Sequence, residues 1–215
     1  ATLNHTDPES DIYYFNFNGY SGKFVFDANG VPQTIPYSTL RIEANPHESP
    51  LTNFTVITEE GIKYKFGGTG YVEESRPEYA KYDDAGAFVS QTKLHQYFNS
   101  AWYLREIKTP NGEIVTFTYS PENCNTESNK SQTRFVDFNS NTIPIYSNNS
   151  TVKNYILGLR LSKINFNNDE VEFYSNKIRE DLNTTTAKAL EKIIVRKNGS
   201  TLLNYVFTTS YFQST

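Results

Sequence analysis

Four carboxylates are the residues whose spacing comes nearest to acid and base catalysis. Glu73 and Glu74 are adjacent, and Asp83 and Asp84 form a second adjacent pair further along the chain. A glycosidase needs two carboxylates about 5–10 Å apart on either side of a sugar. Sequential acids in a polar stretch are more typical of a hydrated surface. We therefore predict that the chain is not an enzyme, and a hydrolase that uses these carboxylates is the third interpretation.

Metal ligation is the next chemistry to consider. The chain has three histidines, none with another histidine or a cysteine two to four residues away, the spacing typical of zinc sites: His5, His47 and His95. The segment Asp137–Asn141 resembles the start of a calcium loop. However, Thr142 stands where such a loop needs glycine, and Asn148 stands where it needs a bidentate acid. The sequence predicts no metal and no cofactor.

The single cysteine, Cys124, lies in an asparagine-rich stretch and cannot form an internal disulfide. We interpret it as an incidental thiol. The glycine-rich stretch 67–70 follows an expected strand, but no Gly-Lys-Ser/Thr sequence or amphipathic helix comes after it. It is therefore expected to be a flexible loop and not a phosphate-binding loop.

Aromatic residues are the most ambiguous signal. They make up 15% of the chain, with 16 Tyr and 15 Phe. Phenylalanines in alternating segments are expected to form the core: Phe15, Phe17, Phe24, Phe26, Phe117 and Phe173. Exposed tyrosine rings can instead stack on sugars, with the hydroxyl as a polar tip. The candidates for such ligand binding are Tyr71, Tyr79 and Tyr82, which lie outside the clearest alternating segments.

Length and charge narrow the function further. A chain of 215 residues can bury about 70% of its unfolded surface without disulfides. The formal net charge of −4 lacks the positive excess needed to bind phosphate backbones, so nucleic acid is not an expected partner. No apolar run approaches the ~18 residues of a membrane span. The chain contains no Met and begins with no signal-like segment, which predicts a processed or excised piece of a larger chain.

Short alternating segments separated by turn residues predict the fold. Three of them contain Leu-x-x-Ile followed by a polar turn: 102–119, 161–174 and 190–207. Looser hairpins are expected at 15–27, with the turn at Gly19–Gly22, and at 54–66. Because period-2 alternation is typical of half-buried strands, we predict an all-β antiparallel meander of repeated hairpins. A continuous twisted sheet, a sandwich and a half-open barrel all fit this pattern.

Two stretches interrupt the alternation. Residues 67–96 are rich in glycine, acids and scattered tyrosines, and residues 120–154 are rich in Asn, Ser and Thr. Such compositions bury little apolar surface to offset the entropy of ordering. We predict long loops at 67–96 and 120–154 within a single β-rich domain that spans 1–215.

The repeated segments resemble a known family. Leu-x-x-Ile, a turn at Asn-Gly and β-rich residues that end in Phe-x-Tyr look like a degenerate unit of the Rhs/YD-repeat proteins. Two stretches, Asp11–Asp27 and Arg179–Leu182, are similar to a region upstream of the regular repeats in large bacterial Rhs-like proteins. The Tyr-Asp dipeptide that names the repeat occurs only at Tyr82-Asp83.

This resemblance implies a non-catalytic structural scaffold or shell domain of a large exported bacterial protein, secreted or on the cell surface. The expected partners are neighbouring repeats of the parent chain, since single hairpins are marginal alone. Exposed strand edges also predict possible self-association. The alternative function is a carbohydrate-binding or adhesive β module that uses Tyr71, Tyr79 and Tyr82.

Overall fold

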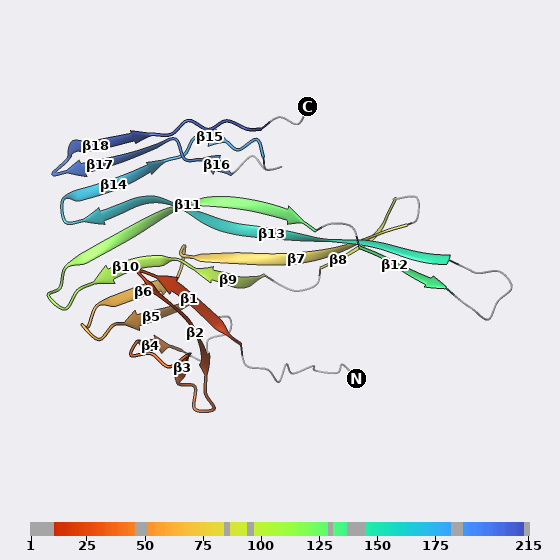
Figure 1. Ribbon diagram of the computed structural model, residues 1–215, viewed down its shortest axis with the longest axis horizontal. Helices are drawn as coiled ribbons and strands as arrows, with labels where there is room; N and C mark the ends of the chain where they lie inside the picture. Colours follow the sequence, from red (N-terminus) through yellow and green to blue (C-terminus); the bar gives the residue numbers. More distant parts are fainter. Residues whose placement is uncertain are drawn as a thin grey trace.

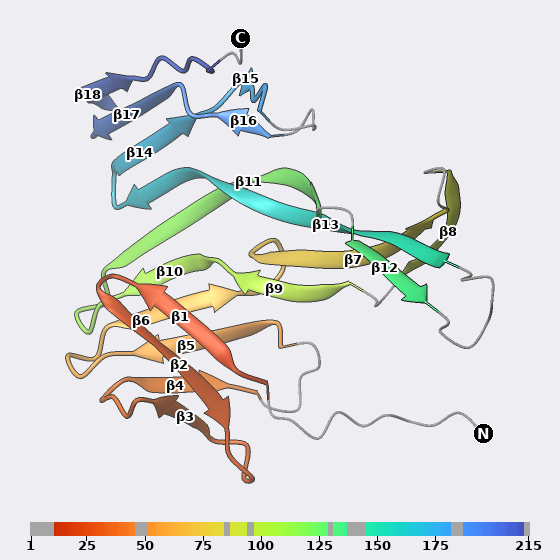
Figure 2. The ribbon, with the colours of Figure 1, turned by 45° about the vertical axis from the view of Figure 1, so that its right-hand side comes forward.

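The computed structural model describes residues 11–45, 51–83, 87–93, 97–128, 131–136, 145–181 and 187–212. These residues form 18 strands, all in antiparallel sheets, and contain no helix. Figures 1 and 2 show a large open sheet crossed at its N-terminal end by a small one. The predicted all-β antiparallel hairpin meander is confirmed.

The small sheet has the order β1 (Tyr13–Phe17), β2 (Tyr20–Phe26), β3 (Pro32–Ile35). The main path of the large sheet runs β18 (Ser200–Val206), β17 (Lys192–Lys197), β14 (Asp169–Tyr174), β13 (Ile145–Phe166), β11 (Ile114–Glu127), β10 (Leu104–Lys108), β6 (Lys63–Gly67), β5 (Asn53–Ile57), β4 (Arg41–Ala44). Four more of its strands lie off this path: β7 (Val72–Tyr82), β8 (Phe88–Lys93), β9 (Phe98–Trp102) and β12 (Ser131–Val136). A separate pair consists of β15 (Lys177–Ile178) and β16 (Lys188–Ala189).

The turn residues account for the hairpins. Asn198 and Gly199 have φ angles of 49° and 79° between β17 and β18, the left-handed pair that a tight hairpin turn requires. Asn18 and Gly19, at 44° and 83°, make the same turn between β1 and β2. The turn expected at Gly19–Gly22 is therefore misplaced, because Asn-Gly meets the φ requirement and leaves Gly22 inside β2.

The Leu-x-x-Ile spacing has a structural cause. Side chains three residues apart point to opposite faces of a regular strand. In β10, Leu104 pairs with Phe66 and Glu106 with Lys65, so one extra residue lies between them. A similar irregularity separates Leu161 from Lys163 in β13. These β-bulges return the leucine and the isoleucine to one face.

The predicted long loops are wrong in the described residues. Strands β7 and β8 occupy much of 67–96, while parts of β11 and β13 and all of β12 occupy most of 120–154. The 22-residue strand β13 supplies the reason, because it pairs with β11, β12, β14 and β7. Hydrogen bonds between the strands satisfy the backbone groups of these polar segments. The small apolar surface that the segments bury would not order them without this pairing.

Pairing makes the large sheet two-faced. Residues directly opposite on neighbouring strands share a face, and one such row contains Ile42, Val56, Tyr64, Ile107, Val115 and Phe166. The opposite face carries ion pairs such as Lys65–Glu106, whose charged atoms are 2.7 Å apart. The sheet is therefore apolar on one face and charged on the other.

The core lies where the small sheet covers the apolar face. Phe24 is fully buried, and Phe15 and Phe17 are nearly so. They pack with the rings of Phe54 and Phe66 from the large sheet. The predicted core positions Phe15, Phe17 and Phe24 are confirmed.

The remaining predicted core positions are less enclosed. Phe26 packs at the margin of this core. Phe117 and Phe173 lie further along the apolar face and are only half-buried. The small sheet extends over the β4–β6 end and not over β14, β17 and β18 (Figure 2), which explains the difference.

Candidate functional site

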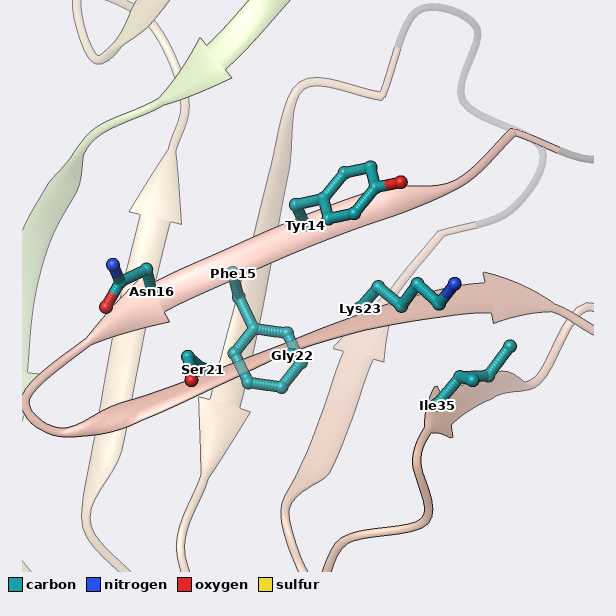
Figure 3. A pocket seen from close by; sticks show the side chains of 7 residues that line it. All are labelled: Tyr14, Phe15, Asn16, Ser21, Gly22, Lys23 and Ile35. Atoms are coloured by element: carbon teal, nitrogen blue, oxygen red, sulfur yellow. The ribbon is translucent and has the colours of Figure 1, made fainter.

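A shallow pocket of about 540 Å³ lies on the outer face of the small sheet (Figure 3). Tyr14 pairs with Lys23, and Lys23 pairs with Ile35, so the three side chains form one row across the strands. Asn16 and Ser21 form the adjacent row. Alternation places Tyr14 outside because Phe15, its neighbour in β1, is buried.

Gly22 and Phe15 complete the lining of this pocket. A Cβ atom at Gly22 would lie 2.8 Å from Cζ of Phe15, so only glycine lets the ring pack against this strand. Tyr14 is 75% exposed. An exposed aromatic ring beside an ammonium, an amide and a hydroxyl suits a sugar, which offers both an apolar face and hydroxyl groups. The lining contains no carboxylate, histidine or cysteine, and this chemistry is that of binding.

The three tyrosines selected from sequence lie apart from this pocket. Tyr71 precedes β7 and packs edge-to-face on Tyr119, with ring centroids 5.8 Å apart. Tyr79 lies inside β7, and Tyr82 ends that strand with its ring edge-to-face on Phe88. An extended chain rises about 3.3 Å per residue, so Tyr71 and Tyr79 are separated by about 26 Å. All three are half-buried, and they do not form one platform.

Strand β7 also separates the candidate carboxylates Glu73 and Asp83. Glu73 accepts hydrogen bonds from the Ser100 hydroxyl at 2.9 Å and the Tyr103 hydroxyl at 3.2 Å. Asp83 accepts one from the Ala87 amide at 2.7 Å, which closes a turn. Ten extended residues place Glu73 and Asp83 about 30 Å apart, far beyond the separation that a glycosidase needs. Asp84 lies outside the described residues.

The structure does not describe the candidate metal ligands. His5, His47, His95 and the segment Asp137–Asn141 lie outside the described residues. Within the described ranges, no group of three or more His, Cys, Asp or Glu residues is placed to hold a metal ion. Cys124 is a free, half-buried thiol in β11, opposite Ile156. The described part of the chain contains no helix that is long and apolar enough to span a membrane.

Sequence reasoning missed a polar centre at a fork in the large sheet. One edge of β13 pairs with β11, and its other edge pairs first with β7 and then with β14. Strand β7 also pairs with β9, which leads directly into β10 beside β11. These pairings form a circuit around Tyr103, at the junction of β9 and β10.

The groups in this fork satisfy one another. Tyr103 donates to Glu73 and accepts a hydrogen bond from the Leu159 amide at 3.4 Å. Tyr119 donates to the Leu104 carbonyl at 2.7 Å. Burial, reinforced by the nearby Tyr103 and Tyr71, raises the pKa of Tyr119 to about 12. A phenol held neutral in this way is a structural donor and not a base.

A ladder of ion pairs crosses β13, β14 and β17 on the charged face of the large sheet. The Lys163 ammonium lies 2.9 Å from Glu170 and 3.0 Å from Glu172. Arg196 forms ion pairs with the same two carboxylates. Glu172 also accepts a hydrogen bond from the Tyr174 hydroxyl at 2.7 Å. That hydrogen bond, followed by those from Arg196 and Lys163, lowers the pKa of Glu172 to about 2.

The lowered pKa of Glu172 predicts a dependence of stability on acid. An ordinary glutamate has a pKa near 4.5, so the stabilisation is fully present above that pH and is lost as the pH falls toward 2. Replacing Glu172 by Gln should lower the melting temperature at pH 7 and weaken its fall between pH 4.5 and 2. Melts across this range test it, with Glu113→Gln in the exposed β10–β11 turn as the control. Equal slopes for Glu172→Gln and the wild type would contradict the assignment.

The chain was compared with family models, curated proteins and solved structures. No family model, curated protein or solved structure matches it. The function must therefore be inferred from the fold and the described side chains.

Proposed function

We propose that this chain is a non-catalytic structural scaffold or shell domain of a large secreted or cell-surface bacterial protein that resembles the Rhs/YD-repeat class. The observation that carries the proposal is the sheet itself. Thirteen strands join into one sheet, with an apolar row across one face and paired charges on the other. Repeat arrays build extended surfaces of this kind by stacking one structural unit against the next.

The internal use of reactive groups supports a structural role. Glu73 accepts hydrogen bonds from Ser100 and Tyr103. Glu172 accepts one from Tyr174 and forms ion pairs with Lys163 and Arg196. A catalytic acid or base needs a free position that faces substrate. The carboxylates of Glu73 and Glu172 instead bind side chains of neighbouring strands, as expected of groups that fix strand register.

The order of the hairpins supports growth by addition. The β13–β14 hairpin is followed along the sheet by the β17–β18 hairpin, and β14 pairs with β17 from Glu170 to Tyr174. Each hairpin thus covers the edge of the one before it. Neighbouring repeats of a parent chain, the expected partners, would extend the sheet in the same way.

A substrate panel separates the scaffold from a hydrolase. We expect no turnover of chromogenic glycosides or esters by the purified chain, because the candidate carboxylates are far apart. Turnover that Glu73→Gln or Asp83→Asn abolishes, in proteins that melt like the wild type, would contradict a non-catalytic role. Turnover unchanged in both variants would point to a contaminant.

The second candidate function is a carbohydrate-binding or adhesive module. The observation that favours it is the exposed Tyr14 ring beside Lys23 and Asn16 in the surface pocket (Figure 3). Tyr71, Tyr79 and Tyr82 remain candidates as separate contacts, not as one platform. Ligand-induced stabilisation distinguishes this module from the scaffold.

A further inference from the structure

Among the described residues, the final strand of the large sheet, β18, is paired along one edge only. It pairs with β17 and is the terminal strand on this side of the sheet. All seven of its residues are exposed. The apolar ones are exposed by 62% at Leu202, 45% at Leu203, 52% at Tyr205 and 72% at Val206.

The two terminal strands on the main path differ in their protection against pairing. At the opposite end, β4 carries the exposed charges of Arg41 and Glu43. Charged side chains on an edge strand discourage pairing with another chain. Strand β18, with the sequence Ser-Thr-Leu-Leu-Asn-Tyr-Val, contains no charge and no proline. It therefore has the composition of a strand that is paired on both sides.

The backbone of β18 is set for a further partner. The Phe207 amide donates to the Glu191 carbonyl at 2.8 Å, toward β17. Backbone groups alternate in direction along a strand, so the N–H and C=O groups of Val206 and Asn204 point away from β17. Asn204 lies midway between Thr201 and Phe207. An antiparallel partner centred on Asn204 would meet these outward groups.

We propose that β18 is a homodimer interface, in which it pairs antiparallel with the same strand of a second copy about a two-fold axis at Asn204. In this register Leu203 lies opposite the partner's Tyr205, and Tyr205 lies opposite the partner's Leu203. Leu202 is the extra residue of a bulge in β18, because Leu203 pairs with Val195 and Thr201 with Arg196, so the regular pairing is centred on Leu203–Tyr205. Two apolar pairs thus form on the apolar face of the sheet. The strand is self-complementary, as an isologous interface requires.

The second copy also continues the apolar face. Leu203 pairs with Val195, which pairs with Val171, so β18 ends the apolar rows of the large sheet. The dimer would carry these rows into the partner without a break. A seven-residue edge pair buries less than the ~1,200–2,000 Å² of a standard stable interface. The dimer is therefore expected to depend on concentration.

Charge substitutions at the two-fold axis test the register. Light scattering over a concentration series should show the wild-type chain passing from monomer to dimer. Asn204→Lys and Asn204→Asp should each remain monomeric, because like charges would lie directly opposite each other. An equimolar mixture of the two variants should dimerise again. Asn111→Lys, in the exposed β10–β11 turn, is the matched control and should dimerise like the wild type.

Several outcomes would overturn the proposal. A wild-type chain that stays monomeric at its highest attainable concentration has no such interface. Dimers that persist in both Asn204 variants use another surface, and a mixture that stays monomeric contradicts the register. Thermal melts of each variant establish that loss of the dimer is not loss of the fold. The inference concerns this chain by itself. A following repeat of a parent chain would pair with the same edge of β18, so that repeat and a second copy exclude each other.

Discussion

Replacing Gly67 by alanine is expected to destabilise the chain by more than ~3 kcal/mol or to prevent its folding. Gly67 has a φ angle of +73°, and a Cβ atom there would lie 2.3 Å from the Thr52 carbonyl oxygen and 2.7 Å from Cδ1 of Trp102. The backbone is held in place, because the Gly67 amide donates to the Tyr103 carbonyl at 3.0 Å. The clash therefore adds to the ordinary cost of a left-handed alanine, roughly 1–2 kcal/mol.

Gly70 offers a matched control for this substitution. Its φ angle of +79° is similar, but no atom lies within 4 Å of the position of a Cβ atom. Gly70→Ala should therefore cost only the conformational part, roughly 1–2 kcal/mol. Chemical denaturation followed by circular dichroism compares the two variants. Equal stabilities would show that the junction of β6 with β9 and β10 is looser than the contacts at Gly67 require.

Replacing Phe24 by alanine is expected to lower the free energy of unfolding by about 3–5 kcal/mol. Phe24 is 0% exposed. Its ring stacks on Tyr13 with centroids 4.9 Å apart and meets Phe54 of the large sheet edge-to-face at 5.9 Å. The substitution would leave a cavity between the two sheets, where rigid neighbours on both sides limit collapse.

The control for Phe24 lies on the same small sheet. Tyr14 is on its outer face, so Tyr14→Ala should change the free energy of unfolding by less than ~0.5 kcal/mol. Urea unfolding measures both variants. If Phe24→Ala lost no more stability than Tyr14→Ala, the small sheet would not be packed on β4–β6.

Local sequence was sufficient where local chemistry decides the structure. The turn at Asn198-Gly199 was predicted because it needs only two residues with left-handed φ angles. The turn at 111–112 was predicted from the same dipeptide, although only Gly112 is left-handed there. The buried Phe15, Phe17 and Phe24 followed from alternation with polar neighbours. Phe117 and Phe173 have the same pattern, but their burial depends on whether a second layer covers them, which alternation does not reveal.

The segments that were wrongly predicted as loops owe their structure to long-range strand pairing. Polar segments at 72–82 and 120–127 become strands because β13 provides a partner from far along the chain. Composition carries no information about that partner. The pairing also explains why Tyr71, Tyr79 and Tyr82 are spread along and beside one strand. Tyr14 could have been found from sequence, since it alternates with the buried Phe15 and must therefore face outward.

The most direct test of the scaffold function is a thermal-shift titration against polysaccharides and oligosaccharides, with and without Ca²⁺. A ligand at ~100 times its dissociation constant adds about 2.7 kcal/mol of stability, which a melt detects readily. The scaffold predicts a cooperative melt that no member of the panel shifts. A shift abolished by Tyr14→Ala, Tyr79→Ala or Tyr82→Ala, but kept in the exposed control Tyr37→Ala, would contradict it and establish a carbohydrate-binding module.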